Sequence, residues 1–244
     1  MLTVLTIFGT RPEAIKLAPV VLELARYPSE IRSVVCITAQ HREMLDQVLR
    51  IFNIQPDLDL NLMTENQTLP GLTSAALLGV TDVLEQVQPN VVLVQGDTTS
   101  AMAAGLAAFY RKSPVGHVEA GLRTGDRYQP FPEEINRRLL SSIATYHFAP
   151  TEMAREALLR EGIADEFVRM TGNTVVDALQ TIARSAESKN AFVTLGIDRR
   201  LILMTAHRRE NFGAPLEDIC RAVQLLVERN EDIEIAYPVH RNPN

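Results

Sequence analysis

Several short segments of the sequence place charged side chains directly after apolar runs, which is where ligands bind in parallel α/β sheets. The first is residues 9–16, GTRPEAIK, in which a turn at Gly9 delivers Arg11 and Lys16 to the start of a predicted helix. The free N–H groups of a helix start favour an anion, so a diphosphate fits this position. An ordinary surface Arg and Lys are the alternative interpretation. The segment has neither a Walker loop nor a G-x-G-x-x-G pattern, so it supports neither ATP nor NAD as the ligand.

Two carboxylates follow predicted strands and are candidates for proton transfer. Asp97 follows the apolar run 91–94 within the segment GDTT at 96–99, although Asp also commonly caps a helix. Further along, strand alternation points His117 and Glu119 to one side, and Gly121 lets the backbone turn. A structural salt bridge from Glu119 to Arg123 is the alternative at this position. Both carboxylates therefore have a structural as well as a chemical interpretation.

A third carboxylate and a histidine complete the polar set. Glu133 lies at a predicted helix start, where the helix dipole alone favours an acid by about 0.3–1 kcal/mol. His207 follows the predicted strand 201–205 and is flanked by cations, with a solvated turn as its alternative interpretation. The sequence contains no Cys-x-x-Cys or His-x-x-x-His spacing and no Gly-x-Ser-x-Gly elbow. We therefore expect neither a metal site nor a serine nucleophile.

The elements that must position these residues are short β-branched runs alternating with amphipathic helical stretches. This alternation predicts an α/β fold, a Rossmann-like parallel sheet with helices on both faces. The run 91–94 is apolar throughout, as a central parallel strand requires. The segment 56–61 is expected to be a polar loop. Expected strands are 3–8, 33–38, 91–94, 115–118, 146–148, 201–205 and 233–237. A first expected helix begins at Pro12, and further expected helices lie within 44–52, 72–87, 101–110, 135–143, 175–182 and 216–227.

Two domains are expected from this order of elements. Residues 1–172 form an N-terminal Rossmann-like domain. Residues 173–244 hold a connecting helix, a polar stretch at 185–190 and the first βαβ part of a C-terminal nucleotide-binding domain. One βαβ unit buries too little surface to be stable alone, so we expect the second domain to be incomplete in this chain.

The bulk composition is that of a globular protein, with 46% hydrophobic and 22% charged residues among 244. A formal net charge of −6 argues against a nucleic acid or an anionic membrane as partner. The sequence contains no basic stretch typical of a signal peptide and no run near the roughly 20 apolar residues of a membrane span. Cys36 and Cys220 lie in apolar contexts and are expected to be two buried free thiols. We expect a cytoplasmic protein.

The chain resembles the bacterial non-hydrolysing UDP-N-acetylglucosamine 2-epimerases in several motifs that follow one another in order. They are FGTRPEAIK, TAQHREMLDQVL, VLVQGDTTS, FYRKSPVGHVEAGLRTGDRYQPFPEE, TGNTVVDAL, TAHRREN and YPVHRNPN. The resemblance implies a GT-B-type fold of two Rossmann-like domains with the active site in the cleft between them, and a homodimer. It also implies interconversion of UDP-GlcNAc and UDP-ManNAc without cofactor or metal, which supplies ManNAc for cell-surface polysaccharide.

The resemblance also assigns roles to the candidate residues and suggests a mechanism. Loss of UDP from C1 gives oxocarbenium character that acidifies the C2 proton, and a carboxylate base then yields 2-acetamidoglucal. Re-addition of UDP with protonation from the other face gives the epimer, and which carboxylate serves which face stays open. By the matching motifs, Arg11 and Lys16 bind substrate, and Asp97, Glu119, Glu133 and His207 are the catalytic groups.

Some members of the family bind a second UDP-GlcNAc as an activator. The matching positions are Gln40, Glu133, Arg208 and His240. Two further positions of that site hold Glu43 and Asn66, where some members have Gln and Arg. The loss of a cation and the gain of an anion disfavour activation in this chain.

Two alternatives to an epimerase follow from the same features. Fold alone does not fix function, so a nucleotide-sugar glycosyltransferase of the same architecture is the first. The family's downstream Ser-Gly-Gly segment, which holds the diphosphate, lies beyond the end of this sequence. A non-catalytic fragment that binds or dimerises is therefore the second.

Overall fold

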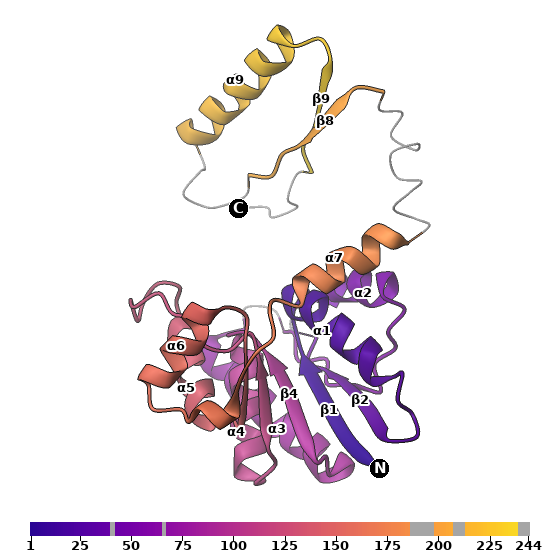
Figure 1. Ribbon diagram of the computed structural model, residues 1–244, viewed down its shortest axis with the longest axis vertical. Coiled ribbons are helices and arrows are strands. Elements are labelled where there is room, and N and C mark those ends of the chain that lie inside the picture. The colour runs from indigo at the N-terminus through magenta and orange to yellow at the C-terminus, as the bar shows by residue number, and fades with distance from the viewer. Residues whose placement is uncertain (40–41, 65–66, 186–197, 207–212, 239–244) are drawn as a thin grey trace. The chain divides into compact units, whose positions relative to one another are not determined.

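The computed structural model describes residues 1–39, 42–64, 67–185, 198–206 and 213–238. These residues divide into two compact units, Met1–Ile182 and Ala183–Asn244 (Figure 1). The first unit extends past residue 172, where the sequence closes the first domain. The reason is helix α7 (Val175–Arg184), which buries Ala178 in the same hydrophobic cluster as α1 (Arg11–Leu24).

The first unit is built on a parallel sheet of seven strands in the order β3-β2-β1-β4-β5-β6-β7. The order reverses direction between β1 and β4, which lie side by side in Figure 1. In such sheets ligands bind beyond the carboxyl ends of the strands at this switch point. The strands are β1 (Leu2–Phe8), β2 (Ile31–Ile37), β3 (Leu58–Asp59), β4 (Val91–Gln95), β5 (Val115–Val118), β6 (Tyr146–Ala149) and β7 (Val168–Met170).

Helices cover both faces of this sheet because alternate strand residues feed two hydrophobic clusters. Leu5 and Ile7 of β1 pack in a cluster with α3, α4 and α5, whereas Phe8 packs in a cluster with α1, α2 and α7. The predicted parallel α/β fold class is thereby confirmed. The remaining helices of this unit are α2 (Arg42–Ile51), α3 (Leu69–Val87), α4 (Thr99–Tyr110), α5 (Glu133–Ile143), α6 (Glu152–Arg160) and the short 3-10 helix η1 (Asp165–Phe167).

Three elements differ from the sequence-based expectation. The expected loop 56–61 contains β3, whose two residues pair with Cys36 and Ile37 at the sheet edge. Residues 152–160 form α6 and residues 168–170 form β7, neither of which was expected. Backbone pairing to neighbouring strands, rather than a β-branched run, defines β3 and β7, so a composition pattern does not reveal them.

The second unit pairs β8 (Arg200–Leu203) with β9 (Ile233–Ala236) in parallel and connects them through α9 (Ala214–Arg229). This is the βαβ unit that the sequence predicts. Cys220 on α9 is exposed, so the expectation of two buried thiols is wrong for this residue, because α9 buries none of its side chains within the described part of the unit. Cys36 is buried as expected, and burial raises the pKa of its thiol to about 12.

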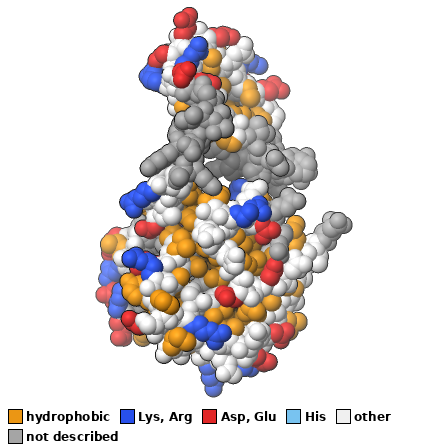
Figure 2. All heavy atoms as spheres, turned by 90° about the vertical axis from the view of Figure 1, so that its right-hand side faces the viewer, with side chains coloured by type: hydrophobic (Ala, Val, Ile, Leu, Met, Phe, Trp, Pro, Cys, Tyr) orange, Lys and Arg blue, Asp and Glu red, His pale blue; other side chains and the backbone are white. Residues whose placement is uncertain are grey.

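Charge on the first unit is mixed rather than segregated. Acidic and basic side chains are interspersed over the face of that unit that Figure 2 shows. A surface of this kind agrees with the modestly negative net charge of −6 and offers no broad cationic area on that face. Among the residues that the structure describes, no helix combines the length and apolar character needed to cross a bilayer.

Candidate functional site

A hollow of about 190 Å³ lies at the carboxyl ends of β1 and β4, the switch point of the sheet. Its lining comes from the turn after β1, the start of α1, the turn after β4, the residue after β5 and one side chain of α5. Five of the eleven residues that line it are ionisable. Those that matter for chemistry are Lys16, Asp97, Glu119 and Arg137.

Glu119 follows the last residue of β5 and has a φ of 65°, in the left-handed region that non-glycine residues rarely adopt. The strand therefore ends before Glu119, and its side chain does not continue the alternation expected from His117. The carboxylate accepts hydrogen bonds at Oε2 from the ammonium of Lys16 and the amide of Gln95, and at Oε1 from Asn173 Nδ2 at 3.3 Å. Backbone strain at functional positions is held by such surrounding contacts.

Arg123 is not the partner of Glu119. Its Nε and Nη2 atoms donate to the two carboxylate oxygens of Glu161 at 2.8 and 2.6 Å. This bidentate pair lowers the pKa of Glu161. The structural salt bridge between Glu119 and Arg123 that the sequence allowed is therefore wrong, since Lys16 makes the ion pair with Glu119 instead.

Asp97 faces α5 and is not a helix cap. The N-cap of α4 is Thr98, whose hydroxyl accepts from the Ala101 N–H at 3.0 Å. The Asp97 carboxylate instead accepts from Arg137, with Oδ2 lying 2.8 Å from Nε and 2.6 Å from Nη2. Its backbone carbonyl accepts from Asn136 Nδ2 at 2.9 Å. The cap interpretation of Asp97 is therefore wrong, and α5 fixes both its side chain and its backbone.

Glu13 joins the two turns that form the floor of the hollow. Its fully buried carboxylate accepts from the N–H groups of Gly9 and Thr10 at 3.0 and 2.7 Å, and from the Thr98 hydroxyl at 2.6 Å. Thr10 precedes the helix and Glu13 is its third residue, which is one half of a capping box. Burial raises the pKa of Glu13 although these donors oppose the shift. One side chain thus couples the turn after β1 to the turn after β4.

His117 is buried beneath the turn that carries Asp97. Its Nε2 atom lies 2.7 Å from the Gly96 carbonyl oxygen, so Nε2 carries the proton and donates it. Nδ1 has no hydrogen-bond partner in the described part of the chain. Burial lowers the pKa of His117 from 6.5 to about 4, which keeps the ring neutral near pH 7. His117 therefore holds the turn at Gly96 rather than lining the hollow.

Glu134 orders the long loop between β5 and α5. Its side chain is fully buried, and the carboxylate accepts from the Thr124 N–H at 3.0 Å. Arg137 and Arg138 on the next turn of the same helix lie 3.4 and 3.2 Å from it. Burial opposes ionisation, but the hydrogen bonds from Thr124 and Arg138 outweigh it and lower the pKa of Glu134. Arg137 consequently bridges Glu134 to Asp97.

The structure brings together some of the predicted site residues and not others. Lys16, Asp97 and Glu119 line the one hollow. Arg11 is exposed as the first residue of α1, and Glu133 is the first residue of α5 and is absent from the lining. Predicted residues outside the described part of the structure are Gln40, Asn66, His207, Arg208 and His240, together with the side chain of Glu43.

Gln95, Arg137 and Asn173 are not among the predicted site residues. Each nevertheless touches a carboxylate of the hollow or its backbone. Two of them could have been found from the sequence. Gln95 is a polar residue at the end of an apolar strand, and Arg137 follows Glu134 at the spacing of helical neighbours. Within the described ranges, no three His, Cys, Asp or Glu side chains are arranged to hold a metal ion.

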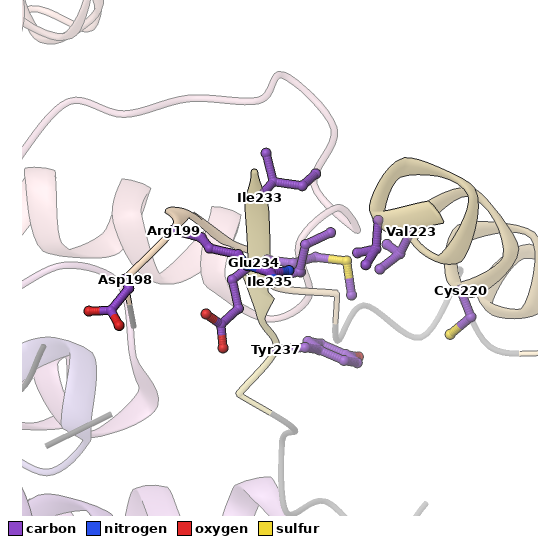
Figure 3. A pocket seen from close by; sticks show the side chains of 10 residues that line it. Asp198, Arg199, Cys220, Val223, Ile233, Glu234, Ile235 and Tyr237 are labelled. Carbon is purple, nitrogen blue, oxygen red and sulfur yellow. The ribbon is translucent and has the colours of Figure 1, made fainter. Parts of the chain in front are cut away.

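A larger hollow of about 680 Å³ lies in the second unit between its strands and α9 (Figure 3). Most of its lining is apolar, including Val223, Ile233 and Ile235, with Tyr237 at one side. The charged side chains of Asp198 and Glu234 point away from that apolar lining in Figure 3. Because converging ionisable groups are what proton transfer requires, we place the candidate site at the smaller hollow of the first unit.

Comparison with known proteins identifies the family. A family profile described as UDP-N-acetylglucosamine 2-epimerase matches residues 23–244. The UDP-N-acetylglucosamine 2-epimerase of Bacillus subtilis (strain 168) is 53% identical over 99% of this chain, and the chain spans 63% of that protein's length. A relative of the same name from Escherichia coli (strain K12) is 52% identical over 99% of this chain, which spans 66% of it.

Solved structures give the same result. The UDP-GlcNAc 2-epimerase from Neisseria meningitidis bound to UDP-GlcNAc matches 99% of this chain, with a TM-score of 0.87 and 50% identity, and the chain covers 67% of that structure. The enzyme from Methanocaldococcus jannaschii in complex with UDP-GlcNAc and UDP matches 98% of this chain, with a TM-score of 0.80 and 38% identity, and is itself covered to 66%. The fold is that of these GT-B-type proteins, and the chain belongs to the UDP-N-acetylglucosamine 2-epimerase family.

Proposed function

We propose that the protein interconverts UDP-GlcNAc and UDP-ManNAc by inverting C2 of the sugar; this chain spans about two thirds of the length of the relatives that it matches. The observation that carries the proposal is the convergence of Lys16, Asp97 and Glu119 on one hollow at the switch point of the sheet. Two carboxylates and a cation are the groups that removal and return of a proton beside a leaving diphosphate require. Family membership supplies the substrate class, because relatives carry UDP-GlcNAc in their structures.

The chemistry follows from the position of the proton. The C2 hydrogen is not adjacent to a carbonyl, so a carboxylate is too weak a base to remove it directly. Cleavage of the C1–O bond sends the electron pair to UDP and leaves oxocarbenium character at C1, which acidifies C2–H. A carboxylate takes that proton, a C1=C2 double bond forms, and 2-acetamidoglucal and UDP result. Addition of UDP to C1 and of a proton to the opposite face of C2 gives the epimer.

The described residues fit complementary parts of this sequence of steps. Asp97 and Glu119 are acid–base candidates because both line the hollow, where Arg137 and Lys16 hold them in place. Lys16 and the exposed Arg11 lie on the first turns of α1, where the helix dipole adds to their attraction for a diphosphate. His207 remains a proposal from the motif alone, as do Glu133 as a catalytic group and the second UDP-GlcNAc site.

Incubation with UDP-GlcNAc in D2O distinguishes this proposal from its alternatives. An epimerase incorporates deuterium at C2 of both UDP-GlcNAc and UDP-ManNAc, because the proton exchanges with solvent on the enzyme. Transfer of GlcNAc to an added acceptor without exchange would instead identify a glycosyltransferase. Binding of UDP-GlcNAc without either reaction would identify a non-catalytic chain, and each of these results would overturn the proposal.

Three further properties belong to the same proposal. The protein works in the cytoplasm, forms a homodimer, and supplies ManNAc units for cell-surface polysaccharide. Sedimentation equilibrium tests the dimer directly, since a single species at the monomer mass at micromolar concentration contradicts it. No cofactor enters the proposed steps, because the carbon that is inverted is never oxidised and only a proton and UDP leave and return.

A further inference from the structure

The side-chain amide of Asn173 makes two hydrogen bonds, one through its oxygen and one through its nitrogen. Its Oδ1 accepts from the Val175 N–H at 3.0 Å, which fixes the start of α7. Its Nδ2 donates to Glu119 Oε1 at 3.3 Å. The backbone N–H demands an oxygen and the carboxylate demands a donor, so only one orientation of the amide satisfies both. A single half-buried side chain therefore joins the start of α7 to a carboxylate of the candidate site.

The contact to Oε1 differs from the others that Glu119 receives. Lys16 and Gln95 both donate to Oε2, and they come from α1 and from the end of β4. Among the described residues, Asn173 is the donor to the other oxygen. The two sets of donors hold the carboxylate from opposite oxygens, which fixes the plane of the carboxylate as well as its position.

We infer that Asn173 is a positioning residue for Glu119, acting through the Nδ2 hydrogen bond while its Oδ1 atom anchors α7. The inference rests on the proposed function, in which Glu119 is an acid–base group. On this inference the orientation of the Glu119 carboxylate depends on where α7 begins. A merely structural Asn173 would serve α7 alone, and any residue with a suitable oxygen would replace it.

The charges around Glu119 determine what a substitution does. The charged groups that line the hollow together with it are Lys16 and the buried Glu13 of α1, Asp97 of the turn after β4, and Arg137 of α5. His117 two residues earlier is neutral near pH 7. A second carboxylate at position 173 would add a negative charge directly beside Oε1. Like charges within about 4–6 Å of each other disfavour ionisation of both.

Two substitutions separate the two contacts of Asn173. Asn173→Ser and Asn173→Asp both keep an oxygen for the Val175 N–H, and both residue types are favoured at helix starts. Asn173→Ser removes the donor to Glu119, and we expect kcat for C2 deuterium exchange to fall about threefold to tenfold with KM unchanged. Asn173→Asp replaces the donor by a negative charge, and we expect kcat at pH 7 to fall at least about tenfold.

The pH–rate profile distinguishes positioning from stability. In Asn173→Asp the acid limb of the profile should move about one pH unit or more toward higher pH, with an unchanged melting temperature. Thr174→Asp is the matched control because it adds the same charge one residue along the chain, and it should keep the wild-type kcat and profile. Wild-type kinetics in Asn173→Asp would overturn the inference. Equal losses in Thr174→Asp, or a loss of kcat that tracks the melting temperature, would do the same.

A measurement without substrate keeps the inference independent of the proposed function. The Glu119 carboxyl carbon can be followed by 13C NMR in labelled protein, with its resonance identified by its absence in Glu119→Gln. We expect it to titrate at higher pH in Asn173→Asp than in wild type. If wild-type protein fails to exchange deuterium, the proposed function fails while this titration still decides the contact. Identical titrations in the two proteins would contradict it.

Discussion

Arg137 donates twice to the same oxygen of Asp97, with Nε at 2.8 Å and Nη2 at 2.6 Å from Oδ2. Oδ1 of Asp97 receives no hydrogen bond from the residues that the structure describes. One oxygen of the carboxylate is thus held by α5, and the other is available to a group that enters the hollow. The guanidinium of Arg137 also lies 3.4 Å from the buried Glu134 carboxylate, which holds it in position.

Arg137→Lys should lower kcat for C2 exchange roughly 10- to 100-fold, because a point charge does not reproduce a planar guanidinium that contacts two carboxylates. KM should change less than kcat, since in the proposed mechanism the contact orients an acid–base group. Arg138→Lys is the control. Arg138 donates to Glu134 and, within the described part of the chain, makes no hydrogen bond to Asp97; it is also half exposed, so its replacement should leave kcat near the wild-type value. Equal effects of the two substitutions would show that Asp97 does not depend on Arg137.

Glu13→Gln should destabilise the fold by about 1–3 kcal/mol, because one amide oxygen replaces two carboxylate oxygens and the amide N–H₂ faces other donors. The three donors left in competition are the N–H groups of Gly9 and Thr10 and the hydroxyl of Thr98. Urea denaturation measures the loss. Glu23→Gln on the same helix changes an exposed carboxylate and should cost less than about 0.5 kcal/mol. A Glu13→Gln protein as stable as wild type would contradict the claim that Glu13 couples the two turns.

His117 should make stability depend on pH in the weakly acidic range. Burial lowers its folded-state pKa from 6.5 to about 4, so between these values the unfolded chain binds more protons than the folded one. Stability from this group is therefore complete above about pH 6.5, falls as the pH drops toward 4, and is constant below that. The full loss is on the order of 3 kcal/mol.

His117→Gln tests this dependence, because its amide nitrogen can still donate toward the Gly96 carbonyl but does not titrate. Urea denaturation of both proteins from pH 7 to pH 4 should show wild type losing stability faster than the variant. His147 is buried on the neighbouring strand, and burial lowers its pKa too, but it is common to both proteins and cancels. Parallel curves of stability against pH would show that folding does not lower the pKa of His117.

Gly121→Ala should be strongly destabilising. Gly121 has a φ of 90°, and a Cβ there would lie 2.1 Å from the carbonyl oxygen of Ala154 in α6. The clash is with backbone, so we expect a loss of about 3 kcal/mol or more, measured by chemical denaturation. Gly125→Ala is a matched control, since its φ is 84° but nothing lies within 4 Å of the added Cβ. It should cost only about 1 kcal/mol, and equal losses would mean that strain rather than contact governs the turn.

Much of the fold could be predicted because the strands that matter are central. β4 is apolar on both faces and β5 ends as expected, so the positions of Asp97 and Glu119 relative to the sheet edge followed from parallel topology. The turn at Gly121 is likewise confirmed, since this residue has a positive φ. Edge strand β3 and the short β7 were missed because pairing with a neighbour defines them and their own residue types do not.

The partners within the site were less predictable than its location. Local spacing suggested that Glu119 pairs with Arg123 and that Asp97 caps α4, and both interpretations fail in the structure. The true partners, Lys16 and Arg137, lie far away in sequence. They reach the carboxylates only because the order of strands places α1 and α5 beside the turns that follow β4 and β5. Contacts of this kind are tertiary, so a pattern along the chain favours the nearest opposite charge instead.

Cleavage of the C1–O bond is the claim on which the proposed chemistry depends, and positional isotope exchange tests it most directly. UDP-GlcNAc is prepared with 18O in the bridge between C1 and the β-phosphorus, and the label is followed by 31P NMR. We predict that wild-type protein moves the label into non-bridging positions of the β-phosphate at least as fast as it exchanges the C2 hydrogen, and that Asp97→Asn does neither. Exchange at C2 while the label stays in the bridge would contradict the account.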